Sequence, residues 1–342
     1  MVFIIFIAMV RNLSAQKGYK TKRENSLCVK AMGQKQSSTT AEGMALVRAI
    51  EASRPEGKRI CYDPLARSMI NGIKFALSKL TIDSGLYGRF FPGALEFITA
   101  RERYIDDFLN ACLKEGLDQV VILIAGFDTR AYRTPVIGKT RVFEVDFPAT
   151  QALKLKRLKK VIAPLPDNVN FVSIDFNNQT LDERLPASGY DEQGKTLFIW
   201  QGVTPYLAEE AVDSTLEFIA HHSGPGSAVI FDYFTHEALH GLEMKKLRPI
   251  MRVIGEKIIF GIDEGRIEQF MTQRGFRDVH NADAEELKRL YFTGQNAGRM
   301  VSKGVNIVSA RVNKMTERIR NYQAKRPLQD IAIWSSQFPA AS

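Results

Sequence analysis

Four positions that follow predicted strands could together bind a nucleoside. Gly126 comes directly after the apolar run of residues 120–124, and Asp146 ends the next apolar run. Asp175 and Gln201 follow the third and fourth runs. Glycine lets a ligand approach the backbone closely, and an acid after the second strand of a doubly wound sheet can accept hydrogen bonds from ribose hydroxyls. Because parallel strands joined by right-handed crossovers end at one edge, the four positions are predicted to share a crevice.

The elements that position these residues alternate along the chain. Strands are predicted at residues 120–124, 142–145, 170–174, 196–200, 228–233, 276–279 and 305–312. Helices are predicted over 41–78 with breaks, 95–115, 208–222, 236–274 and 283–291, with a glycine-rich aromatic loop at 86–92. This alternation predicts an α/β fold whose mostly parallel sheet carries helices on both faces. A lone acid at a strand end usually only adds solubility, whereas four polar strand ends in register favour a binding site.

Length and charge predict one large domain without a nucleic-acid surface. The chain has 342 residues and a formal net charge of +9. Residues 1–35 hold seven Lys or Arg against one acid, which accounts for six of the nine charges. We therefore predict a disordered basic arm at 1–40, a single domain with an N-terminal helical cap at 41–320, and a tail at 321–342. The remaining charge is too small for a domain-wide nucleic-acid footprint.

Cysteine usage and hydropathy indicate a cytoplasmic protein. The three cysteines, Cys28, Cys61 and Cys112, are odd in number, widely spaced and lack a CxxC pair. This usage indicates a reducing compartment and no cysteine-based metal site. The opening residues 1–10 are apolar, but they are too short to cross a bilayer and lack the basic start of a secretory signal.

A second chemistry is suggested by the sequence HEALH at residues 236–240. On a helix His236 and His240 lie on one face at i and i+4, a spacing that can hold zinc, with Glu237 as a base. A third ligand would have to come from a later acid, and the candidates are Glu256, Glu264 and Glu268. The alternative reading is therefore a zinc-dependent hydrolase. A coincidental histidine pair on an ordinary helix explains the same residues.

Several segments in order resemble one known family. They are residues 48–53 (RAIEAS), 63–66 (DPLA), 101–107 (RERYIDD), 123–133 (LIAGFDTRAYR), 143–148 (FEVDFP), 172–175 (VSID) and 200–207 (WQGVTPYL). Over about residues 44–235 the chain resembles the leucine carboxyl methyltransferase family of S-adenosylmethionine-dependent enzymes, in its bacterial and archaeal O-methyltransferase-like branch. The resemblance implies a class I methyltransferase fold, Rossmann-like, with a seven-stranded sheet whose last strand is antiparallel.

The resemblance also implies which residues hold the cofactor S-adenosyl-L-methionine. They are Arg48, Arg101, Ala125, Gly126, Asp146, Asp175, Phe176 and Gln201. The two arginines would bind the methionine carboxylate, for which a forked guanidinium is well suited. Gly126 would line the methionine portion and Asp146 would accept the ribose hydroxyls. Asp175 and the backbone at Phe176 would meet the adenine.

Two residues depart from the family pattern. The family usually has LGAG where this chain has LIAG at 123–126, so Ile124 occupies a glycine position. It usually has an acid where Gln201 stands, and the amide keeps an acceptor but loses the negative charge. These departures motivate a further alternative, a protein that binds S-adenosylmethionine without transferring its methyl group.

The predicted reaction is methyl transfer to oxygen. A carboxylate or hydroxyl of a small molecule is the expected acceptor, although the family as a whole acts on acceptors as different as a protein C-terminus, a polyketide and a modified tRNA base. Candidates for lining the acceptor pocket are Tyr206, Asp232, Tyr233 and His236, which lie just after the fourth strand or around the end of the fifth. Each is equally compatible with ordinary packing. No general base is assigned, and a carboxylate acceptor would not require one.

Overall fold

The computed structural model describes residues 34–176, 178–241, 244–245 and 258–314. Its centre is a sheet of eight strands: β1 (Gln119–Leu123), β2 (Arg141–Asp146), β3 (Val169–Ser173), β4 (Thr196–Trp200), β5 (Ala228–Thr235), β6 (Gly261–Ile262), β7 (Phe276–Ala282) and β8 (Val305–Val312). Seven strands follow the order β3-β2-β1-β4-β5-β8-β7, and β6 pairs with the end of β5. The last strand, β8, is antiparallel to both β5 and β7. The predicted seven-stranded sheet with an antiparallel last strand is confirmed, with β6 as an addition.

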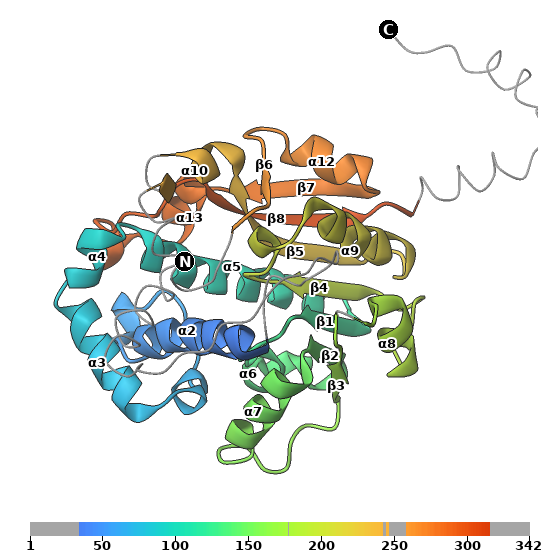
Figure 1. The fold of residues 1–342 in the computed structure, drawn as a ribbon, viewed down its shortest axis with the longest axis horizontal. Coiled ribbons are helices and arrows are strands. Elements are labelled where there is room, and N and C mark those ends of the chain that lie inside the picture. Colours follow the sequence, from blue (N-terminus) through green and yellow to red (C-terminus); the bar gives the residue numbers. More distant parts are fainter. Residues whose placement is uncertain (1–33, 177, 242–243, 246–257, 315–342) are drawn as a thin grey trace, which may run out of the picture.

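Helices cover both faces of this sheet (Figure 1). Around the first face lie α2 (Gln34–Ala52), α5 (Ala94–Lys114), α7 (Pro148–Leu158) and α13 (Ala284–Tyr291), and around the second lie α8 (Leu181–Ala187), α9 (Glu209–His221) and α12 (Ile267–Gln273). Shorter helices are α3 (Gly72–Asp83), α4 (Leu86–Phe90), α6 (Arg130–Arg133) and α10 (His236–His240). Single 3₁₀ turns are η1 (Glu56–Lys58), η2 (Ala66–Met69), η3 (Pro135–Lys139), η4 (Thr204–Tyr206) and η5 (Gly294–Asn296).

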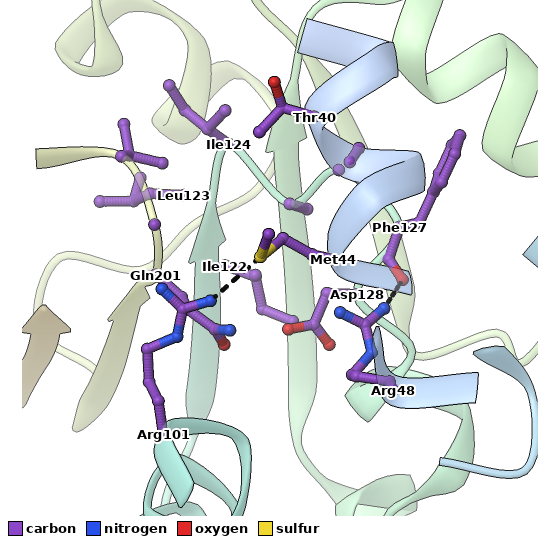
Figure 2. Close-up of a pocket in the computed structure, with 15 residues that line it drawn as sticks. Thr40, Met44, Arg48, Arg101, Ile122, Leu123, Ile124, Phe127, Asp128 and Gln201 are labelled. Carbon is purple, nitrogen blue, oxygen red and sulfur yellow. Dashed lines mark hydrogen bonds between the residues drawn. The ribbon is translucent and has the colours of Figure 1, made fainter. Parts of the chain in front are cut away.

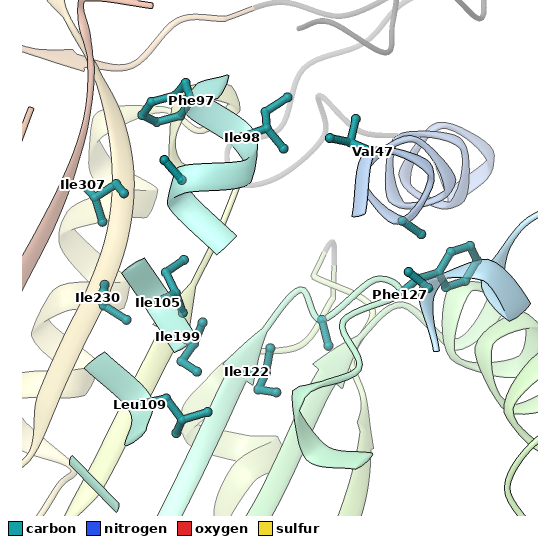
Figure 3. Close-up of a cluster of buried hydrophobic side chains, with 14 of the residues drawn as sticks. Val47, Phe97, Ile98, Ile105, Leu109, Ile122, Phe127, Ile199, Ile230 and Ile307 are labelled. Atoms are coloured by element: carbon teal, nitrogen blue, oxygen red, sulfur yellow. The ribbon is translucent and has the colours of Figure 1, made fainter. Parts of the chain in front are cut away.

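Strand β1 contributes to both apolar cores because successive side chains point to opposite faces. Val120 and Ile122 belong to the core on the α5 side, whereas Val121 and Leu123 belong to the core on the α9 side. Figure 3 shows the first of these cores, in which side chains of α5 lie beside isoleucines of β1, β4 and β5. All five residues of β1 are buried. A continuous apolar strand of this kind is typical of a parallel sheet covered on both faces, as the sequence predicted.

Two segments differ from the predicted secondary structure. Residues 86–92 contain helix α4 instead of a loop, because Gly85 takes the left-handed conformation that allows a helical turn to begin at the next residue. Within 236–274, predicted as helical, the described residues hold α10, the strand β6 and α12. Strand β6 has two residues and exists because Gly261 and Ile262 pair with the end of β5, a long-range contact that periodicity does not reveal.

The predicted arm and tail lie mostly outside the described residues. Helix α2 begins at Gln34, seven residues before the predicted start of the domain at residue 41. The rest of the arm, residues 1–33, and the tail at 321–342 are outside the described ranges. Within the described ranges, every helix is too short or too polar to cross a lipid bilayer.

A close backbone contact supports the connection between α9 and β5. Gly224 donates its N–H to the Gly194 carbonyl oxygen at 2.9 Å, and a Cβ at position 224 would overlap the Gln193 carbonyl oxygen. We predict that Gly224→Ala lowers the free energy of unfolding by about 1–3 kcal/mol, as overpacking does. Gly57→Ala is the control, since a Cβ there meets no atom within 4 Å. Urea denaturation measures both, and equal midpoints for the two variants would contradict the prediction.

Candidate active site

A cavity lies between α2 and the carboxyl ends of β1 and β4. We call it the α2 cavity. Its lining consists of Thr40, Ala41, Met44 and Arg48 from α2, Arg101 from α5, residues 122–128, and residues 201–203. It contains about 630 Å³ of unfilled space, part of which is open to solvent. Figure 2 shows Arg48 and Arg101 reaching it from two different helices. Five of the eight predicted cofactor residues line it: Arg48, Arg101, Ala125, Gly126 and Gln201.

The turn after β1 forms the floor of this cavity, and short contacts fix its shape. Ala125 donates its N–H to the Val145 carbonyl oxygen at 3.0 Å, and Gly126 donates its N–H to Oδ2 of Asp146 at 2.5 Å. Gly126 has a φ of +50°, and a Cβ added there would lie 3.0 Å from the Cβ of Ala41. The glycine is therefore required both by the backbone conformation and by the close approach of α2.

Asp146 ends β2 beneath this turn, and its side chain is 1% exposed. Its Oδ1 accepts the Phe147 N–H at 2.6 Å, while Oδ2 holds the Gly126 N–H. Burial raises the pKa of Asp146 to about 6, although both backbone hydrogen bonds act in the opposite direction. Asp146 does not line the α2 cavity in this conformation. Its role toward a ribose therefore stays a prediction.

A buried ion-pair network surrounds Arg130, the first residue of α6. Its Nε donates to Asp106 at 2.6 Å, Nη2 donates to Oε2 of Glu102 at 2.7 Å, and Nη1 donates to Gln201 at 2.9 Å and also to Asp128. Burial alone would raise the pKa of Glu102, but the charges of Arg48 and Arg130 hold it at about 2. The network therefore stays ionised at neutral pH and joins α5, the β1 turn and the end of β4.

Arg48 and Arg101 are both buried, and each already has a carboxylate partner. Nε of Arg48 donates to Asp63 at 2.8 Å, and Nη2 donates to the Phe127 carbonyl oxygen at 2.5 Å. Nη1 of Arg101 donates to Asp232 at 2.7 Å, and Nη2 contacts the sulfur of Met44 at 3.4 Å (Figure 2). Nε of Arg101 is buried and has no hydrogen-bond partner in the described part of the chain.

A second cavity adjoins the first at α5. This α5 cavity is lined by Thr40, Met44, Ala94, Phe97, Ile98, Arg101, Gly202, Pro205, Tyr206, Asp232, Phe234, Ser302 and Val305. It shares Thr40, Met44, Arg101 and Gly202 with the α2 cavity. Arg101 and Asp232 are the charged residues of its lining, and they neutralise each other. Two of the four predicted acceptor residues, Tyr206 and Asp232, therefore lie in one largely apolar cavity.

A third cavity lies on the other side of the β1 turn. This α9 cavity is lined by Leu123, Ile124, Phe176, 178–182, Trp200 and Leu207, together with Ala211, Ser214, Thr215 and Phe218 of α9. It contains about 1060 Å³ of unfilled space, including open solvent. Leu123 and Ile124 line both this cavity and the α2 cavity. Phe176, the predicted adenine neighbour, is the one predicted cofactor residue in this lining.

Besides Asp146, three predicted residues line none of these three cavities. The carboxylate of Asp175 accepts the Asn178 amide at 3.0 Å, in the loop beside the α9 cavity. Tyr233 is buried in the core and its hydroxyl donates to Asn281 at 3.0 Å. His236 lies on the surface, where Nδ1 is 2.7 Å from Asp263. The structure thus places Tyr233 and His236 away from the candidate acceptor cavity.

The zinc hypothesis is not supported. HEALH forms helix α10 as expected, but Nδ1 of His240 is 2.8 Å from the carbonyl oxygen of His236. In the described ranges, no cluster of three or more His, Cys, Asp or Glu is arranged to hold a metal ion. Of the predicted third ligands, Glu256 lies outside the described residues, and the histidine pair itself forms part of a short surface helix.

Sequence reasoning missed the residues that α2 and α5 contribute to the site walls. Thr40 and Met44 line both the α2 and α5 cavities, and Glu102 balances Arg48 and Arg130. Glu102 lies within the RERYIDD segment, so its charge beside Arg101 was a usable signal. Thr40 and Met44 carry no such signal, because their location depends on how α2 packs over the β1 turn.

Comparison with known proteins assigns the class of the fold. A methyltransferase from Thermobifida fusca matches at a TM-score of 0.50 and 15% identity, over 79% of this chain and 94% of that one. A DUF574 family protein from Streptomyces avermitilis matches at a TM-score of 0.50 and 11% identity, over 78% of this chain and 96% of that one. These likenesses establish the class I methyltransferase fold.

Sequence comparison then gives the family. The model of the leucine carboxyl methyltransferase family matches residues 41–220, and the chain belongs to this family. A relative from Rhodococcus jostii, named as an S-adenosyl-L-methionine-dependent methyltransferase, is 32% identical over 74% of this chain and 86% of its own length. A relative of the same name from Mycolicibacterium paratuberculosis is 29% identical over 70% of this chain and 80% of its own length. The predicted enzyme class and cofactor are confirmed.

The structure explains the departure at Gln201. Its amide nitrogen donates to Oε1 of Glu102 at 2.6 Å, so a carboxylate lies directly behind the amide. Glu102 belongs to the family-like segment 101–107, and it places a carboxylate from α5 beside position 201. Exchanging the two side chains tests whether the two positions are coupled.

We predict that the exchange variant E102Q/Q201E is more stable than either single variant. Gln201→Glu places two carboxylates in contact, and Glu102→Gln removes a partner of Arg130, so each should cost about 3 kcal/mol. The double variant restores one carboxylate, and a coupling energy above about 1 kcal/mol is expected from thermal or urea unfolding. Glu115→Gln, in an exposed pair with Arg311, is the control and should cost less than about 1 kcal/mol. Strictly additive losses in the free energy of unfolding would contradict a coupling between positions 102 and 201.

Proposed function

We propose that this enzyme methylates an oxygen atom of a small molecule, with the methionine end of S-adenosylmethionine in the α2 cavity and the acceptor in the α5 cavity. The observation that carries the proposal is the shared wall: Arg101, Met44, Thr40 and Gly202 belong to both linings. Two ligands bound in these cavities would meet at that wall, as a direct group transfer requires.

The residues of the α2 cavity fit this cofactor. Arg101 has a buried Nε without a partner in the described part of the chain, and a carboxylate would satisfy it. Gly126 brings backbone to the cavity floor without a side chain, as close approach of a ligand needs. When bound, the cofactor supplies an electrophilic methyl group on a sulfonium. Arg48 and Arg101 would hold its carboxylate end, while the loop at Phe176 and Asp175 would face its adenine.

The α5 cavity fits an acceptor with a large apolar part. Phe97, Ile98, Phe234 and Val305 supply most of its apolar surface, and the cavity contains about 630 Å³ of unfilled space, including open solvent. Pockets of this size and character are typical of small-molecule sites. The family model is named for a carboxyl acceptor, which supports oxygen as the atom that receives the methyl group.

The state of Asp232 favours a carboxylate acceptor over a hydroxyl. A hydroxyl acceptor needs a base, but Oδ2 of Asp232 pairs with Arg101 at 2.7 Å and Oδ1 accepts the Gly202 N–H at 2.6 Å. Both oxygens therefore hold Arg101 and the turn at Gly202, and we assign Asp232 this positioning role instead of that of a base. A carboxylate is already ionised at neutral pH and requires no base. The tasks left to the chain are to align the acceptor and to exclude water.

Titration calorimetry and product detection test the proposal. Purified protein should bind S-adenosylmethionine with one site per chain, and it should form S-adenosylhomocysteine when supplied with apolar carboxylic acids. Absence of binding would contradict the proposed site. Binding without turnover over a broad set of carboxylic acids and phenols would favour the non-catalytic alternative.

The buried free thiols of Cys61 and Cys112 support the predicted cytoplasmic location.

Cofactor affinity should depend on the ionisation of Asp146. The pKa of this carboxyl is raised to about 6, so Asp146 is a carboxylate above pH 6 and becomes neutral below it. A neutral carboxyl accepts hydrogen bonds from ribose hydroxyls more weakly than a carboxylate does. We predict that the Kd for S-adenosylmethionine rises as pH falls from 7.5 to 5, by up to about tenfold. Asp146→Asn should bind weakly and lose this dependence, whereas an unchanged pH profile in the variant would contradict the assignment.

A further inference from the structure

Among the described residues, the linings of the α2 and α9 cavities share Leu123 and Ile124. Leu123 is buried in the core on the α9 side, whereas Ile124 is half-buried. Ile124 follows the last residue of β1, and Figure 2 shows its side chain at the rim of the α2 cavity beside Thr40. A ligand extending from one cavity into the other has to pass this side chain.

The backbone of Ile124 is strained. Its φ is +52°, in the left-handed region, where a β-branched residue is a genuine outlier. Among the described residues Asp278 is the other non-glycine with a positive φ, at +51°, and it lies on the exposed strand β7 far along the chain from the crevice. The turn conformation thus suits a glycine, the residue that the family pattern has at position 124. Strain of this kind persists where the surrounding structure imposes it, and it is often found at ligand sites.

We propose that Ile124 is the residue that sets cofactor affinity in this enzyme, because its side chain narrows the passage between the two cavities. This inference rests on the proposed function. The methionine end of the cofactor would lie in the α2 cavity and the adenine in the α9 cavity, with the connecting ribose beside residue 124. The bulk of Ile124 then opposes ligands that span both cavities and leaves ligands confined to one cavity unaffected.

Fragments of the cofactor separate this effect from a general structural one. On this placement methionine would lie in the α2 cavity and adenine in the α9 cavity, whereas S-adenosylmethionine and S-adenosylhomocysteine would span both. Ile124→Ala and Ile124→Gly should each bind the two spanning ligands about tenfold more tightly, since they relieve an overpacked contact. Their affinities for methionine and for adenine should match those of the parent protein. Calorimetric titration of the full-length protein measures all four ligands.

Stability measurements distinguish bulk from backbone strain. Ile124→Ala keeps the left-handed strain and loses packing, so its urea midpoint should fall below that of the parent. Ile124→Gly removes the strain and should have a higher midpoint than Ile124→Ala. Asp278→Gly is the matched control: it relieves the same backbone strain outside the crevice, so its midpoint should rise while its affinity for S-adenosylmethionine stays unchanged.

Each result decides between the alternatives. Equal affinity of the parent and both Ile124 variants for S-adenosylmethionine would overturn the inference and leave the proposed cofactor site standing. Tighter binding of methionine or adenine alone by the variants would also overturn it, because the effect would then be a general loosening of the site. If neither the parent nor any variant binds S-adenosylmethionine, the proposed function itself fails. Tighter binding confined to the two spanning ligands supports the inference.

Discussion

The candidate active site depends on the burial of one guanidinium group, that of Arg130. A buried charge without partners would cost several kcal/mol, so each of its nitrogens has an acceptor. Those acceptors lie on α5 (Glu102 and Asp106), in the β1 turn (Asp128) and after β4 (Gln201). The ion-pair network therefore ties three distant segments into one wall. This wall is formed by contacts within the protein, so the crevice is shaped before a ligand arrives.

Carboxyl groups inside and outside this network differ in their pKa. Arg48 and Arg130 keep the pKa of Glu102 at about 2, so the wall holds its charge across the physiological range. Asp146 lies outside the arginine contacts and receives only two backbone N–H groups, and its pKa rises to about 6. A fixed electrostatic frame thus lies beside a carboxyl whose pKa is raised to about 6.

Much of the fold and part of the site follow from the sequence. Apolar runs ending in Gly126, Asp146 and Gln201 predicted the strands and their common edge, because buried parallel strands have a strong local signal. The cavity-lining positions of Arg101 and Gly126 were predicted from motifs. Thr40 and Met44 were not, since their place follows from the packing of α2 over the turn. Strand β6 was missed for the same reason: two residues become a strand only because the end of β5 is there to pair with them.

The two departures from the family pattern, Gln201 and Ile124, differ in whether a neighbouring residue can make up for them. The amide of Gln201 contacts Glu102 at 2.6 Å, so a carboxylate from another helix lies beside this position. Ile124 has no such substitute, because a neighbour cannot change the φ of +52° that its own backbone adopts. A lost charge can be replaced from any adjacent element, whereas a conformational requirement must be met by the residue itself. The backbone strain at Ile124 therefore remains within the site, at a residue that lines both the α2 and the α9 cavities.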